Sequence, residues 1–186
     1  MRAVGLVLLV AACGPGGEKG DQGEPGPQGP PGPMGSAATT LGQQIVEVYG
    51  TGQLVVTNAT NYSLIPGLAA NVTVPAGARV RVDTSGGIQC SQAGSAYSVV
   101  DVAIFVDDGL STAGGQRRVV AANTQSLGQT ITNWSFTRSY TLAAGNHNFE
   151  VRAAGVVDDV MAAPAHVSSA GAPQLQGTLT VTVLLQ

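Results

Sequence analysis

The chain has 186 residues, of which 44% are hydrophobic, 10% are charged and 4% are aromatic. Its net charge of -3 at pH 7 excludes a strongly basic surface of the kind that binds nucleic acids or anionic membranes. Because aromatic residues are scarce, a folded part of the chain must build its core mainly from Val, Ala, Leu and Ile.

The first twelve residues have the pattern of an export signal. Arg2 supplies a positive charge, and the apolar run from Val4 to Ala12 is too short to span a bilayer. The residues Leu-Val-Ala-Ala that precede Cys13 resemble the lipobox of bacterial lipoproteins. This resemblance implies cleavage before Cys13 and lipidation of that residue, and two or three acyl chains would make a stable membrane anchor. The alternative is an ordinary signal peptide cleaved after Ala12, which would leave a free thiol.

Glycine recurs at every third position directly after this cysteine. The pattern begins at Gly14, and the collagen-register glycines that follow are Gly17, Gly20, Gly23, Gly26, Gly29, Gly32 and Gly35. This is the Gly-X-Y repeat of collagen, in which only glycine fits at the axis where three polyproline II chains meet. A flexible Gly/Pro linker, the alternative, needs no strict period of three. At about 3 Å per residue, this segment would form a rod on the order of 60 Å long. Because so short a triple helix should not hold three chains together alone, we expect another part of the chain to nucleate the trimer.

The end of the period of three marks a boundary between parts of the chain. We predict a signal peptide over 1–12, a lipid-anchor junction over 13–16, a collagen-like segment over 17–37, a linker over 38–44 and a head over 45–186. A head of this length is sufficient for one domain with a substantial core.

Short alternating runs separated by turn residues predict that the head is all-β. The predicted strands cover 45–49, 53–57, 71–74, 78–83, 97–106, 117–120, 134–142, 146–152 and 179–183. Val80 and Val82 should point inward, and the strand 134–142 places its aromatic residues on one face and its hydroxyls on the other. Gly, Thr, Asn and Val disfavour a helix here. The spacing of the strands favours a β-sandwich or jelly roll.

The sequence resembles bacterial collagen-like surface proteins, both in its collagen repeat and in later segments such as WSFTRSYTLAAGNHNFEVRA and GTLTVTVLL. Their heads are similar to trimeric tumour-necrosis-factor and complement-type jelly rolls. The match is specific in the collagen segment and is only a general pattern in the head. The resemblance implies a homotrimer whose head seeds the triple helix, and it assigns no catalytic residue or binding site to this chain.

Few residues of the sequence are candidates for catalysis or for binding a cofactor or metal. The sequence has no paired-cysteine metal spacing, no HExxH, no GxSxG and no phosphate-binding loop, and we therefore expect no catalytic, cofactor or metal site. His147 has the parity of buried neighbours and should be a satisfied core or interface histidine, whereas His166 should be solvated in a loop. We interpret Asp107 and Asp108 as turn residues. Calcium bound by these two and by Asp158–Asp159 is a weaker alternative.

Two other side chains need a structural explanation. Arg138 falls on the aromatic face of its predicted strand, where its guanidinium requires either a carboxylate or carbonyl partner or contact with solvent. We favour contact with solvent, which a long side chain can reach from the edge of a strand. Cys90 should be a small buried hydrophobe.

Two classes of function remain after these exclusions. The first is a lipid-anchored homotrimer at the outer membrane or cell surface of a bacterium, with a structural or adhesive role like that of an extracellular matrix. The second is a module whose head binds a glycan or an extracellular protein with avidity from three sites. A bland surface of Thr, Ser and Asn would favour the structural role, whereas an exposed aromatic patch or an acidic calcium cluster would favour binding. We do not expect an enzyme, which would need a pocket with convergent titratable groups.

Overall fold

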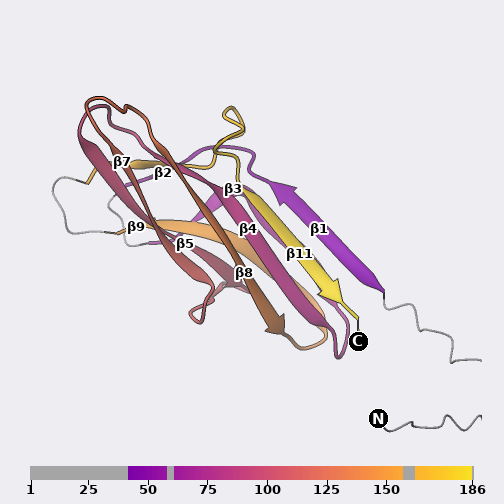
Figure 1. Ribbon diagram of the computed structural model, residues 1–186. Helices are drawn as coiled ribbons and strands as arrows, with labels where there is room; N and C mark the ends of the chain where they lie inside the picture. The colour runs from indigo at the N-terminus through magenta and orange to yellow at the C-terminus, as the bar shows by residue number, and fades with distance from the viewer. Residues whose placement is uncertain (1–41, 58–60, 157–161, 186) are drawn as a thin grey trace, which may run out of the picture. The chain divides into compact units, whose positions relative to one another are not determined.

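The computed structural model describes residues 42–57, 61–156 and 162–185 of the chain (Figure 1). All of them belong to the unit Thr39–Gln186. Every regular element within these ranges is a β-strand, and the strands form two antiparallel sheets. The prediction of an all-β sandwich is therefore confirmed for the head. The signal peptide, Cys13, the collagen-register glycines and Asp158–Asp159 lie outside the described residues.

Sheet A is organised around β4 (Arg79–Cys90). On one side β4 pairs with β8 (Ile131–Thr141), and on the other it pairs first with β11 (Thr178–Leu184) and then with β10 (Ala165–Val167). Two further strands extend the sheet, because β11 pairs with β1 (Gln43–Tyr49) and β10 pairs with β2 (Leu54–Val56). Strand β1 thus starts inside the predicted linker 38–44. The edge strands of sheet A are β8, β1 and β2.

Sheet B has the order β3 (Ser63–Val74), β9 (Gly145–Gly155), β5 (Ala96–Val106), and it continues beyond β5 with two strands. These are the short β6 (Gly109–Leu110) and the longer β7 (Gln116–Asn123), which pair with different parts of β5. The edge strands of sheet B are therefore β3, β6 and β7. Figure 1 shows β3, β5 and β9 crossing behind β4 and β8.

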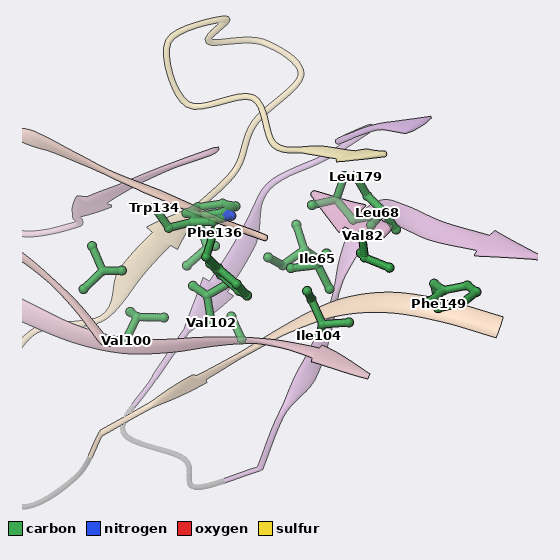
Figure 2. Packing of buried hydrophobic residues seen from close by; sticks show 14 of the residues in the cluster. Ile65, Leu68, Val82, Val100, Val102, Ile104, Trp134, Phe136, Phe149 and Leu179 are labelled. Atoms are coloured by element: carbon green, nitrogen blue, oxygen red, sulfur yellow. The ribbon is translucent and has the colours of Figure 1, made fainter. Parts of the chain in front are cut away.

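The core fills the space between the two sheets. Alternate residues of each strand point into it, and Val80 and Val82 of β4 are fully buried there, as the sequence predicted. In Figure 2, Trp134 and Phe136 of β8 lie over Val102 of β5. The hydroxyl residues between and beyond these aromatics on β8 are exposed, so the predicted division of that strand into two faces is also confirmed.

A bulge shapes the first half of β3. Its pairing with β9 is irregular between Leu64 and Ala69, and Gly67 within this stretch has a φ of 87°. A Cβ at Gly67 would collide with the backbone of Tyr49 and Thr51. Glycine is therefore required here both by its positive φ and by the close approach of the chain that follows β1.

Candidate functional surfaces of the head

The outer face of sheet A is a polar surface whose side chains align across four strands. Its members come from β1, β11, β4 and β8 in register. Successive rows are Tyr49, Thr178, Ser85 and Ser135; then Glu47, Thr180, Asp83 and Thr137; then Ile45, Thr182, Arg81 and Ser139. Hydroxyl side chains predominate in these rows. Exposed Tyr49 and Ile45 lie at the β1 end of these rows, and the rest is mainly the Thr-rich and Ser-rich surface expected of a structural role.

Two adjoining hollows form a shallow groove on this face, which we call the sheet A groove. The smaller hollow, of about 120 Å³, is lined by residues that include Asp83, Thr137 and Thr180. The larger hollow, of about 300 Å³, is lined by residues that include Asn133 and Gln174, and both hollows are bordered by Ser85 and Ser135. The groove therefore offers mainly hydroxyl and amide groups for hydrogen bonding.

The carboxylate of Asp83 is held in place by its neighbours. Nε and Nη2 of Arg81 donate hydrogen bonds to its two oxygens at 2.9 and 2.8 Å, and the hydroxyl of Thr137 donates another. Burial opposes ionisation of Asp83, but the hydrogen bonds from Arg81 and Thr137 outweigh it and hold the pKa below its usual value. Asp83 is thus a fixed negative acceptor within the groove.

Beneath the groove lies the indole of Trp134, which is buried. Its Nε1 donates to Oγ1 of Thr84 at 3.2 Å, and that hydroxyl donates to the carbonyl of Thr178 at 2.9 Å. Trp134 faces Gly86 across the β4–β8 pairing, and a Cβ at Gly86 would collide with the indole ring. The aromatic ring therefore supports the groove from below and does not offer an exposed face on which a ligand could stack.

Asp107 and Asp108 form the tight turn between β5 and β6. Both residues have positive φ, 50° and 63°, as a two-residue type I′ hairpin requires. The prediction that they are turn residues is confirmed. The carboxylate of Asp108 pairs with Arg152, and that of Asp107 pairs with His147 and with the backbone of Asn148. Among the described residues, no three His, Cys, Asp or Glu side chains come together in a way that could hold a metal ion.

Both ring nitrogens of His147 have partners. Nδ1 lies 2.7 Å from Oδ2 of Asp107, and Nε2 lies 2.9 Å from the carbonyl oxygen of Ala143. The side chain is 13% exposed, which confirms the prediction of a satisfied histidine near the core. A carboxylate and a carbonyl can only accept hydrogen bonds, so the arrangement is complete only when both ring nitrogens carry protons. The hydrogen bonds with Asp107 and Ala143 accordingly raise the pKa of His147 above 6.5.

This pair predicts how the stability of the head depends on pH. The backbone of Asn148 and the ring of His147 lower the pKa of Asp107 below 3.8, so its contribution is present above pH 3.8 and is lost as the pH falls through the lowered pKa. The contribution of His147 is complete below pH 6.5 and is lost as the pH rises through the raised pKa. We therefore expect the His147–Asp107 pair to stabilise the head most between pH 3.8 and pH 6.5. Thermal unfolding measured across and beyond this pH range tests the expectation. A His147→Gln variant should lose the alkaline decline, and the control His166→Gln should retain it. Identical profiles for the two variants would contradict this assignment.

The prediction for His166 is wrong. The residue does not lie in a solvated loop: it is half-buried in β10, opposite Gln89 of β4 and Val55 of β2. Three residues are too few to show a period in the sequence, and this segment becomes a strand because β4 and β2 provide hydrogen-bonding partners on both of its sides.

The structure also places Arg138 and Cys90. Arg138 is half-buried on the inner side of the edge strand β8, with its guanidinium carbon 5.9 Å from the ring centre of Tyr140. Its Nε is buried and has no hydrogen-bond partner in the part of the chain that is described. Cys90 is buried in the core, as predicted, and it forms no disulfide with any described residue.

An aromatic and charged cluster that the sequence did not predict lies on the outer face of sheet B. Phe105 points outward from β5 but is only 7% exposed. Tyr62 packs against it edge to face, with ring centres 5.3 Å apart, and the guanidinium carbon of Arg152 lies 4.6 Å from its ring centre. On the same sheet, Arg118 forms a bidentate ion pair with Asp101, in which Nε and Nη2 each donate to one carboxylate oxygen at 2.9 Å. The aromatic ring of Phe105 is thus covered by the chain's own side chains.

Comparisons with known proteins find similar solved structures but no family. Neither a family model nor a curated protein matches the chain. Among solved structures, a family 35 carbohydrate-binding module from Clostridium thermocellum aligns with 75% of this chain and 97% of its own, at 13% identity and a TM-score of 0.28. A likeness this distant identifies neither a family nor a ligand. None of the elements described here is a helix long and apolar enough to cross a membrane.

Proposed function

We propose that this protein is a lipid-anchored, homotrimeric, collagen-like protein of the bacterial outer membrane or cell surface, with a structural or adhesive role. In this proposal Cys13 carries the lipid, the Gly-X-Y segment forms a short triple-helical stalk, and the β-sandwich is a jelly-roll-like head that promotes the trimer. It assigns no catalytic role to the chain.

The observation that carries the proposal is the position of the glycine register in the sequence. Eight glycines recur at intervals of three from Gly14 to Gly35, and the first of them directly follows Cys13. A triple helix requires this period because three chains share one crowded axis, whereas a flexible tether does not. An anchor site immediately before a stalk is the arrangement that would hold a head at a distance from a membrane.

The surface of the head supports a structural role. The rows of Thr and Ser on the outer face of sheet A can make hydrogen bonds to water over a wide area, and the aromatic residue Phe105 on the outer face of sheet B is covered by Tyr62 and Arg152. The acidic turn at Asp107 and Asp108 is neutralised by His147 and Arg152. These features are those of a soluble head that needs no ligand to be complete.

The lipid anchor is tested by metabolic labelling with radioactive palmitate. We expect the wild-type chain to incorporate the label and to partition with membranes, because acylation of Cys13 would provide more than one acyl chain. A Cys13→Ser chain should lose both properties. A Cys90→Ser chain is the matched control, because it removes the other cysteine, and it should still be labelled. Equal labelling of the wild type and Cys13→Ser would refute the anchor.

The sheet A groove favours a second candidate function, in which the head recognises a neutral glycan. Its hydroxyl and amide side chains can exchange hydrogen bonds with sugar hydroxyls, and Asp83 provides a fixed charged acceptor. Three copies of a weak site on one trimer would raise the apparent affinity through avidity.

A glycan array probed with the lipid-free trimer tests this candidate. If the groove binds sugars, the double variant Asn133→Ala and Gln174→Ala should lose about tenfold or more in affinity, since each removes a hydrogen bond. Asn71→Ala, an exposed amide on sheet B, is the control and should bind as the wild type does. If no glycan binds, or if the groove variant and the control bind equally, this candidate is excluded.

A further inference from the structure

We propose that three copies of the head meet at the corner of sheet A where β1 begins and β11 ends, and that Ile45, Leu184 and Leu185 form this contact. We call these three residues the β1 corner. The inference rests on the proposed trimer and adds to it the surface through which the heads associate.

The β1 corner is the place on sheet A where exposed apolar side chains gather. Ile45 is 58% exposed, Leu184 39% and Leu185 37%. Gln43 pairs with Leu184, and Ile45 pairs with Thr182, so Ile45 and Leu184 are diagonal neighbours on the same face of the sheet. The amide of Leu185 donates to the carbonyl of Gly42 at 3.2 Å, which holds it against the start of β1. Figure 1 shows the start of β1 beside the end of β11.

Strand β1 is also an edge without the usual protection. Among the described residues it pairs only with β11, and its seven residues QQIVEVY contain no Pro, no Lys and one charge, Glu47. Its inward-facing Val46 and Val48 are only partly buried. An apolar edge strand of this kind has unpaired backbone groups that favour association with another chain.

The other edges that the structure describes carry features that discourage association. Strand β3 has a bulge containing Pro66, and β7 presents Arg117 and Arg118. Strand β8 has hydroxyl residues outward and Arg138 on its inner side, whereas β2 and β6 are only three and two residues long. The contrast with these edges is what distinguishes β1 as the edge that is covered in the assembled protein.

The length of the chain before β1 identifies the partner as further copies of this chain. Six residue steps separate Ala37, the last residue of the predicted collagen-like segment, from Gln43, and they can span at most about 20 Å. In a triple helix the three Ala37 residues are adjacent, so each β1 must start within that distance of the end of the rod. Among the described residues, the exposed apolar side chains beside that start are those of the β1 corner. A head-to-tail contact between three copies closes into a ring and leaves no corner exposed.

Sedimentation equilibrium of the full-length, lipid-free chain, carrying Cys13→Ser, tests the inference. We expect Ile45→Glu to raise the concentration needed for half-trimerisation by about tenfold or more, because it places a charge in an apolar contact. Val120→Glu is the matched control: Val120 is also a β-branched strand residue, 47% exposed, but it lies on β7, and its substitution should leave the trimer unchanged. Circular dichroism of the head reports whether each variant is folded.

A second, milder variant keeps the test decisive if Ile45→Glu does not fold. Ile45→Thr retains a β-branched side chain suited to a strand and removes apolar area, so it should weaken the trimer to a smaller extent. A wild-type trimer that neither Ile45 variant weakens would overturn the inference and leave the proposed function standing. A wild-type chain that is monomeric would instead refute the proposed trimer itself.

Discussion

A Gly26→Ala substitution should strongly lower the melting temperature of a triple-helical circular-dichroism transition and leave the β-sandwich folded. In a triple helix the change would place three methyl groups at an axis where only glycine fits. The head should be unaffected, because Gly26 belongs to the predicted collagen-like segment and not to the head. Thermal melting monitored separately at triple-helical and β-sheet wavelengths measures both parts in one sample.

Gln28→Ala is the control for this experiment. It introduces the same residue in the same triplet but at the Y position, which faces away from the axis, so its effect should be small. If Gly26→Ala and Gln28→Ala behave alike, or if the wild type shows no triple-helical transition, the Gly-X-Y segment is a linker.

Trp134→Ala should destabilise the head by about 3–5 kcal/mol, a large part of the stability of a typical domain. The buried indole packs in the core and donates to Thr84, so its removal leaves both a cavity and a lost hydrogen bond. Urea unfolding monitored by circular dichroism measures this loss. Val120→Ala, on the exposed face of β7, is the control and should change the free energy of unfolding little.

Gly86 provides a second test of the same packing. A Cβ at Gly86 would collide with the indole of Trp134, so Gly86→Ala alone should cost roughly 1–3 kcal/mol. In the double variant with Trp134→Ala most of that collision is absent, and the two losses should sum to more than the double variant shows. Additive losses would mean that Trp134 does not lie over Gly86.

Much of the head could be predicted from the sequence because parts of its long strands alternate between inward and outward residues. The residues of β4 around Val80 and the aromatic face of β8 have a period of two, and burial on one side of a sheet enforces that period. The first half of β3 was missed because Pro66 and Gly67 break the alternation at a bulge. Strand β4 was predicted too short, because Gly86 and Gly87 have low strand propensity and are held there by pairing with β8.

The candidate surfaces were less predictable than the strands. The pairing of His147 with Asp107 depends on β5 and β9 being neighbours, and the sheet A groove depends on β11, β4 and β8 lying side by side. A period of two says which residues share a face of one strand, but it does not say which strands are adjacent. The exposed β1 corner shows the same limit, since Ile45 and Leu184 are far apart in the chain and meet only through the pairing of β1 with β11.

Sedimentation equilibrium of the lipid-free chain carrying Cys13→Ser, with and without residues 14–37, tests the central proposal most directly. We predict that the chain containing the Gly-X-Y segment is a trimer with a reversible triple-helical transition. The shortened chain should retain a concentration-dependent trimer through its head. A chain that sediments as a monomer at every concentration, with or without residues 14–37, would contradict the proposal of a trimeric collagen-like stalk.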